Sequence, residues 1–91
     1  MIRLERAGTE DLETIIAIQR ASFKAVYEKY QDEYDPYLED RERIKWKLAE
    51  RPNSYYYFVK KDEENIGFLR VQTNEELTEA WLGTAAILPQ H

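Results

Sequence analysis

Four tyrosines lie within one short stretch of the sequence, and they are its densest group of side chains able to contact a ligand. They are Tyr27, Tyr30, Tyr34 and Tyr37, spaced by three, four and three residues. In a helix this spacing places all four phenols along one face. Two interpretations stay open. The rings pack on the core with their hydroxyls in water, or they form the wall of a binding cleft, since tyrosine offers an apolar body and a polar tip.

The remaining reactive side chains exclude several kinds of chemistry. The sequence contains no cysteine, so a disulfide framework, a thiolate nucleophile and a thiolate metal site are all excluded. The only histidine, His91, is the last of the 91 residues, which argues against a histidine-based nucleophile relay or metal site. The acidic residues lack the spacing of a calcium-binding loop. We expect no metal site.

The charge balance is acidic, with 18 Asp and Glu against 13 Lys and Arg and a net charge of -5. Nucleic-acid binding needs clustered basic residues that neutralise phosphates, so we set this function aside. No apolar run approaches the roughly 20 residues that span a bilayer, and the N-terminus lacks the apolar core of a signal peptide. We therefore expect a soluble, cytoplasmic protein without a membrane partner.

The first half of the sequence predicts one strand followed by helices. Residues 2–6 alternate apolar and charged side chains, which is typical of a half-buried strand. Residues 10–22 form an amphipathic helix, and residues 24–37 form a second short helix that Asp35-Pro36 ends. Residues 39–50 form a further helix, whose charged side chains we expect to face solvent.

The second half predicts three strands in a meander. They cover residues 55–60, 66–72 and 79–88, and short polar turns join them. The last eleven residues, 81–91, are the most apolar run in the chain and predict a buried strand. The fold class is therefore α+β: one domain over residues 1–91, with a mostly antiparallel sheet, two to three helices and the order β-α-α-β-β-β.

Four segments in this order resemble the first half of the GNAT superfamily, the acetyl-CoA-dependent N-acetyltransferases. They are the helix 11–23, the segment 27–32, the strand Asn65–Val71, and Trp81-Leu82-Gly83 leading to Ile87-Leu88-Pro89. The resemblance covers nearly the whole chain. It implies a truncated GNAT-like domain over residues 1–91 that corresponds to the N-terminal half of the acyl-CoA N-acyltransferase fold.

The resemblance implies acetyl transfer from acetyl-CoA to an amine, by direct attack within a ternary complex. In the family, a Gln/Arg-x-x-Gly-x-Gly/Ala loop follows the fourth strand and holds the pyrophosphate of coenzyme A at a helix N-terminus. The glycines of this chain are Gly8, Gly67 and Gly83, and none forms such a loop. We therefore expect the 91-residue chain to bind acetyl-CoA weakly and to be inactive by itself.

By the same resemblance, the end of the fourth strand offers backbone groups to the pantetheine arm of the cofactor. Matching the register at Pro89 places these positions at Ala85, Ala86 and Ile87. The small side chains at positions 85 and 86 suit the close approach of a ligand. An alternative stays open, in which they are small only because they pack under a helix.

The resemblance also implies an acceptor site between the first two helices, which would involve Phe23, Tyr27 and Tyr30. Many family members use a glutamate on the fourth strand as a general base acting through water. Trp81 occupies that region here, and the nearest acid is Glu79, which we expect to be exposed. The catalytic base therefore stays unassigned. The acceptor is expected to be a small-molecule amine, because tyrosines surrounded by acids favour a cation.

The alternative function is a non-enzymatic association module. In this chain the terminal strand would form a sheet edge, and exposed edge strands pair with other chains. A two-fold homodimer is the commonest closed arrangement, so we expect a dimer joined through Leu82–Leu88. A separate partner chain that covers the same strand is a further alternative.

Overall fold

The computed structural model describes all residues, 1–91. Its elements in chain order are β1 (Ile2–Arg6), the 3-10 turn η1 (Thr9–Asp11), α1 (Leu12–Tyr30), the 3-10 turn η2 (Pro36–Leu38), α2 (Arg41–Ala49), β2 (Ser54–Lys61), β3 (Glu64–Thr73) and β4 (Ala80–Ile87). This order confirms the α+β fold class predicted from the sequence.

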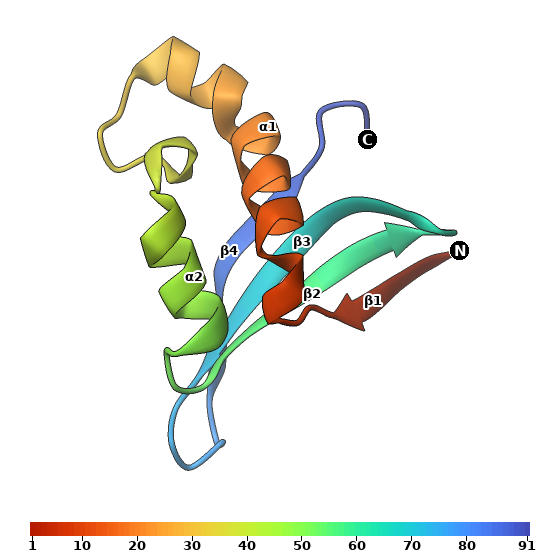
Figure 1. Ribbon diagram of the computed structural model, residues 1–91, viewed down its shortest axis with the longest axis vertical. Helices are drawn as coiled ribbons and strands as arrows, with labels where there is room; N and C mark the ends of the chain where they lie inside the picture. Colours follow the sequence, from red (N-terminus) through yellow and green to blue (C-terminus); the bar gives the residue numbers. More distant parts are fainter.

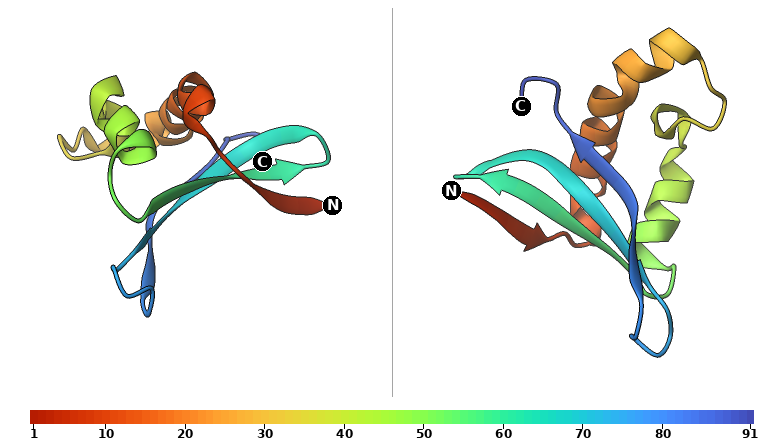
Figure 2. Two further views of the ribbon diagram at one scale, coloured as in Figure 1. Left: turned by 60° about the horizontal axis from the view of Figure 1, so that its bottom comes forward. Right: turned by 180° about the vertical axis from the view of Figure 1, so that it is seen from behind.

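The four strands form a single antiparallel sheet in the order β1-β2-β3-β4. Both helices lie on the same face of this sheet (Figure 1). α1 packs against β3 and β4, and α2 packs against β2. Figure 2 shows the helices on one side of the sheet and no element on the other. The molecule therefore has two layers, and the second face of the sheet is open.

The hydrophobic core lies between the sheet and the two helices. Its buried members are Ala7, Leu12, Ile15, Ile16, Ile18, Ile44, Tyr56, Phe58, Phe68 and Ala86. Tyr56 and Phe58 are alternate residues of β2, as expected when one face of a sheet is buried. Tyr56 and Phe68 pack ring against ring, with their centroids 5.5 Å apart. The aromatic strand residues therefore enlarge the core of a short chain.

α1 is longer than the sequence predicted. The prediction ended the first helix near residue 22 and placed the tyrosines on a second helix, whereas α1 continues without a break to Tyr30. The prediction was wrong because residues 23–30 contain neither glycine nor proline, and Lys24 pairs with Glu28 one turn later. The helix ends at Gln31, whose φ of 51° is left-handed and whose N–H donates to the Tyr27 carbonyl at 2.7 Å.

The four tyrosines therefore do not lie on one helix face. Tyr27 and Tyr30 belong to α1, Tyr34 lies in the following loop, and Tyr37 lies in η2. Tyr27 and Tyr37 stack with their ring centroids 5.0 Å apart. Tyr30 and Tyr34 are 66% and 85% exposed. The stacked pair fastens the loop back onto α1, and the other two rings face solvent.

β4 is an edge strand, and most of it is exposed. The sequence predicted a buried strand here, but only Ala86 is buried, and Leu82 is 58% exposed. The physical reason is that β4 has a hydrogen-bonded neighbour on one side only and a helix layer on one face only. The prediction that this strand forms a sheet edge is confirmed.

A bulge interrupts the pairing of β3 with β4. Arg70 is opposite Thr84 and Val71 is opposite Leu82, so Gly83 is an extra residue without a partner. A Cβ at position 83 would come closer than 3.0 Å to the guanidinium of Arg70. A side chain at position 83 would therefore force the Arg70 guanidinium to move, and glycine lets it lie against the bulge.

Candidate functional site

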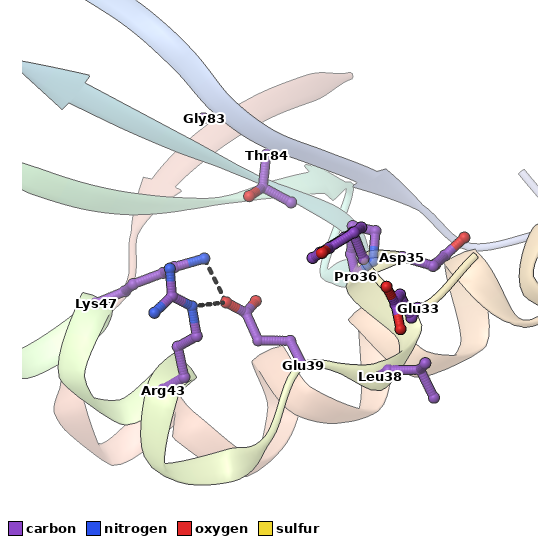
Figure 3. Close-up of a pocket in the computed structure, with 10 residues that line it drawn as sticks. Glu33, Asp35, Pro36, Leu38, Glu39, Arg43, Lys47, Gly83 and Thr84 are labelled. Atoms are coloured by element: carbon purple, nitrogen blue, oxygen red, sulfur yellow. Dashed lines mark ion pairs between the residues drawn. The ribbon is translucent and has the colours of Figure 1, made fainter.

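The structure has one pocket, with a volume of about 440 Å³, between the α1–α2 loop, α2 and β4. Its lining residues are Glu33, Tyr34, Asp35, Pro36, Leu38, Glu39, Arg43, Lys47, Gly83 and Thr84. Figure 3 shows Lys47, Arg43 and Glu39 at one end, Glu33 and Asp35 at the other, and Thr84 across from them. Below, the first is called the basic end and the second the acidic end. The volume suits a small molecule.

Glu39 is the best-connected side chain of the pocket. Its Oε2 atom forms ion pairs with Lys47 Nζ and with Arg43 Nε, the second at 3.3 Å. Its Oε1 atom accepts a hydrogen bond from Gln19 Nε2 at 2.9 Å, and the same amide donates to the Pro36 carbonyl at 2.7 Å. The Glu39 carboxylate therefore joins α1, η2 and α2 at the basic end.

This cluster corrects the expectation that the charges of the helix around α2 face solvent. Lys47 is buried, and the Glu39 side chain is only 11% exposed. α2 begins later than predicted, because the Asp40 side chain accepts from the Arg43 N–H at 2.8 Å and caps the helix. Because Lys47 is buried, its charge requires a partner, which Glu39 supplies.

The loop that carries the acidic end is held by side chains of its own. Asp35 is buried and accepts from the Tyr37 N–H at 2.9 Å, which caps η2. Pro36 at the first position of η2 fixes the direction of the turn. Glu33 forms no hydrogen bond or ion pair and is exposed. The pocket therefore presents one free carboxylate, Glu33, beside one that is already bonded to the backbone.

Arg70 lies on β3 directly beneath the bulge and is only 6% exposed. Its Nη1 donates to Ser54 Oγ at 3.0 Å and to Gln72 Oε1 at 2.9 Å, and both acceptors are uncharged. Its Nε is buried without a hydrogen-bond partner. Burial lowers the pKa of the Arg70 guanidinium, with the nearby Tyr56 and Glu39 acting in the opposite direction. A buried cation without a carboxylate partner is costly to a fold.

Tyr56 is opposite Arg70 on β2 and is almost fully buried. Burial raises the pKa of its phenol above the ordinary value, and the Glu39 charge raises it further. The phenol is therefore neutral at physiological pH and contributes apolar area and a polar tip to the core under the pocket.

The predicted cofactor positions lie at the free edge of β4, just beyond the pocket. Leu88 N–H donates inward to the Ile66 carbonyl at 2.8 Å. Because backbone groups of an antiparallel strand alternate in direction, Ala86 also points toward β3 while Ala85 and Ile87 point outward. Ala86 is buried, and Ala85 and Ile87 are exposed. The alternative explanation for the two small side chains, that they pack under a helix, therefore fits Ala86, which is buried, and does not fit Ala85, which is exposed.

The predicted acceptor residues Phe23, Tyr27 and Tyr30 are not among the residues that line the pocket. Phe23 is partly buried against the core, Tyr27 stacks on Tyr37, and Tyr30 points to solvent near Lys29. Of the four tyrosines, only Tyr34 lines the pocket. Their role in acceptor binding stays a prediction.

Sequence reasoning missed the residues that form the pocket. The sequence predicts a solvated helix face for Glu39, Arg43 and Lys47, which line the pocket, and it assigns no role to Arg70. Two signals were available. A lone glycine inside a strand, Gly83, indicates a bulge or a close approach. Arg70 also shares its strand face with Phe68, which places a cation on the buried side. Glu79 is exposed, as expected.

No group of three or more metal-binding side chains occurs in the structure. No helix combines the length and the apolar character that crossing a membrane requires.

The family profile described as the acetyltransferase (GNAT) family matches residues 13–91 of this chain. The chain belongs to the GNAT family of acetyltransferases. This confirms the resemblance seen in the sequence. A search of curated proteins returned no match.

Two solved structures show the same fold as this GNAT chain. One is the PaiA N-acetyltransferase from Thermoplasma acidophilum in complex with coenzyme A, with a TM-score of 0.72 and 21% identity. The other is a possible acetyltransferase from Clostridium difficile 630, with a TM-score of 0.67 and 14% identity. Both matches cover 100% of this chain, but only 61% and 60% of the respective neighbour. The GNAT chain therefore spans about three fifths of the length of these structures.

Proposed function

We propose that this chain forms the acceptor pocket and the acyl end of the cofactor site of an acetyl-CoA-dependent amine acetyltransferase. The observation that carries the proposal is the position of β4. Gly83 and Thr84 line the pocket, and the outward-facing Ala85 and Ile87 follow at the free edge of the same strand. One strand therefore brings an acceptor pocket next to a row of unpaired backbone groups.

The free edge suits the pantetheine arm of acetyl-CoA. That arm contains amides, which pair with the outward N–H and C=O groups of Ala85 and Ile87 as a further strand would. Ala85 has no side chain beyond Cβ that would block the approach. Bound there, acetyl-CoA supplies an activated acetyl group as a thioester. The role of the protein is to hold the amine in the pocket close to that end of the cofactor.

The chain offers less to the phosphates of the cofactor. None of its glycines forms the Gly-rich loop that holds a pyrophosphate at a helix N-terminus. We therefore propose weak binding, with a dissociation constant above about 100 µM, roughly -5.5 kcal/mol. We also propose that the 91 residues alone do not acetylate amines.

The test is a titration of the chain with acetyl-CoA at millimolar concentration, followed through its backbone amide resonances by NMR. Shifts are expected at Ala85 and Ile87 and not along β1. ADP, which has the phosphates but no pantetheine, is expected to leave these resonances unchanged. If acetyl-CoA moves no resonance of β4, the cofactor proposal is wrong.

Proline substitutions provide a matched pair on adjacent residues. Ala85→Pro removes an outward N–H and leaves the β3–β4 ladder intact, because proline is tolerated at an edge whose N–H faces solvent. It is expected to abolish the acetyl-CoA shifts while the chain stays folded. Ala86→Pro removes an inward N–H and is expected to destabilise the sheet instead.

The second candidate function is association through β4, and one observation favours it. The unpaired edge of β4 carries exposed apolar side chains, including Leu82 and Ile87. Such an edge pairs with a second strand. A two-fold homodimer joined through Leu82–Leu88 would pair the free backbone groups of β4 in both copies.

Light scattering at micromolar concentration tests this candidate. A dimer that Ala85→Pro converts to a monomer would support pairing through β4. A monodisperse monomer would exclude the homodimer. Acetylation of any amine by the pure chain would overturn the proposal that it is inactive.

A further inference from the structure

The charge of Arg70 has no counterion within the protein. The side chain is 6% exposed, its hydrogen bonds go to the neutral groups of Ser54 and Gln72, and its Nε has no partner. The carboxylate whose charge acts on Arg70 is that of Glu39, which already forms ion pairs with Lys47 and Arg43. A buried charge left in this way lowers stability, unless a ligand compensates it.

The guanidinium of Arg70 borders the basic end of the pocket. It stands where a Cβ of residue 83 would be, and Gly83 lines the pocket. Because residue 83 has no side chain, nothing from that position separates the guanidinium from a ligand. The cation without a counterion and the pocket therefore lie next to each other, and an anionic group bound in the pocket could pair with Arg70.

The two ends of the pocket differ in charge. Two cations, Arg43 and Lys47, line the basic end together with the single carboxylate of Glu39. Arg70 adds a third positive charge directly behind Gly83. The acidic end has the carboxylates of Glu33 and Asp35 and no cation. Figure 3 shows the lining residues of these two ends on opposite sides of the pocket.

We propose that this pocket binds an amine that also carries a carboxylate group. The carboxylate lies at the basic end beside Arg70, and the ammonium lies at the acidic end near Glu33. Guanidinium groups bind carboxylates strongly and with defined geometry. Treating that amine as the acetyl acceptor rests on the proposed function, whereas carboxylate binding rests on the pocket alone.

The charge pattern argues against the two simpler ligand classes. A diamine would place its second cation against Arg43, Lys47 and Arg70, where like charges repel. A simple carboxylic acid would bind at the basic end but would offer Glu33 no cation, and the negative charges of the acidic end would repel it. Only a ligand with both groups complements both ends.

The experiment is a calorimetric titration of the whole chain with ω-amino acids of increasing length: β-alanine, γ-aminobutyrate and ε-aminocaproate. Each is compared with the alkylamine that lacks its carboxylate, which is ethylamine, propylamine or pentylamine. At least one amino acid is expected to bind tenfold more tightly than its alkylamine. Equal binding within every pair would overturn the proposal, and so would the absence of any amino-acid binding.

Arg70→Gln tests the role of the charge, and Arg6→Gln on the opposite face of the sheet is the matched control. Arg70→Gln is expected to remove the tenfold preference, and Arg6→Gln is expected to keep it. In the unaltered protein, the Nε–H resonance of Arg70 is expected to shift with the amino acid and not with the alkylamine. That resonance keeps the proposal testable even if Arg70→Gln does not fold. An unchanged resonance at saturating amino acid would overturn it.

Butyrate, which lacks the amine of γ-aminobutyrate, tests whether the acidic end recognises an ammonium group. If butyrate binds as tightly as γ-aminobutyrate, the acidic end does not recognise an ammonium and the proposal is wrong. All of these measurements omit acetyl-CoA. A failure of the cofactor titration at Ala85 and Ile87 therefore leaves amino-acid binding intact, and a failure here leaves the cofactor result intact.

Discussion

The two faces of the sheet are built from alternate residues of the same strands, but they have different surroundings. On the covered face, Tyr56 and Phe68 are almost fully buried against α1 and α2. Their neighbours Tyr57 and Leu69 point to the open face and are only half-buried. Both pairs are apolar or aromatic. The comparison teaches that the helix layer, and not the apolar character of the strands, determines where the core forms.

The open face is an apolar surface partly covered by one charged side chain. The Arg6 guanidinium lies over the rings of Tyr55 and Tyr57, at 4.4 and 5.7 Å from their centroids. Leu4, on the same face, is 56% exposed. The free energy of folding should therefore be concentrated on the covered face.

The largest test of this difference is Phe68→Ala. Removing a buried ring loses its transfer free energy and leaves a cavity, so the free energy of unfolding is expected to fall by about 3–5 kcal/mol. Urea denaturation followed by circular dichroism measures the change. Leu69→Ala, one residue along on the open face, is the control and should cost less than half as much. Equal losses would show that the open face is as tightly packed as the core.

The buried ion pair gives the next largest effect. Lys47→Met removes the more buried of the two cations that pair with Glu39, which is expected to cost about 1–3 kcal/mol. The control is Lys45→Met on the same helix, because Lys45 is exposed and forms no ion pair. Its effect should stay within about 0.5 kcal/mol. If the two variants unfold at the same urea concentration, the Glu39 cluster contributes nothing to stability.

The buried Tyr56 is expected to make the stability of the protein depend on pH in the alkaline range. Tyrosine ionises near pH 10 in an unfolded chain, whereas burial raises the pKa of Tyr56 in the folded protein. Above about pH 10 the unfolded state therefore loses a proton that the folded state keeps, and stability falls as pH rises, by up to about 1.4 kcal/mol per pH unit. Tyr56→Phe is expected to flatten this decline, measured by urea denaturation between pH 9 and 11 (about one unit either side of the tyrosine value). An unchanged slope would contradict burial of the phenol.

The smallest expected effect is on the open face. Leu4→Ser replaces an exposed apolar side chain and should change the free energy of unfolding by less than about 0.5 kcal/mol. A loss that grows with protein concentration would show instead that a second copy covers this face, because association makes apparent stability depend on concentration.

The fold could be predicted because its strands carry strong local signals. β2 is a continuous run of aromatic and β-branched residues, β3 is rich in the same residue types, and β1 alternates apolar and charged residues. The end of α1 was harder to predict, because only Tyr27 and Tyr30 of the four regularly spaced tyrosines belong to that helix. The prediction that β4 is buried was wrong, because the apolar composition of a strand does not determine how many neighbouring strands it has.

The pocket could not be predicted because its members meet only in three dimensions. Glu39 and Lys47 are eight residues apart in a stretch whose charges resemble those of any exposed helix. Arg70 and Gly83 belong to different strands, and only the register of β3 with β4 brings them together. Their contact depends on a bulge whose exact position no local pattern specifies.

The pairing of β1 has a consequence for how the chain folds. β2, β3 and β4 are joined by short turns, whereas Ile2 pairs with Lys61 across almost two thirds of the chain. Closing so long a loop costs entropy before the contacts form, and every residue of β1 is exposed. β1 should therefore dock last during folding and open first in the native protein. Its amide hydrogens should exchange with solvent well before those of β3, which pairs with a strand on each side from Gly67 to Gln72.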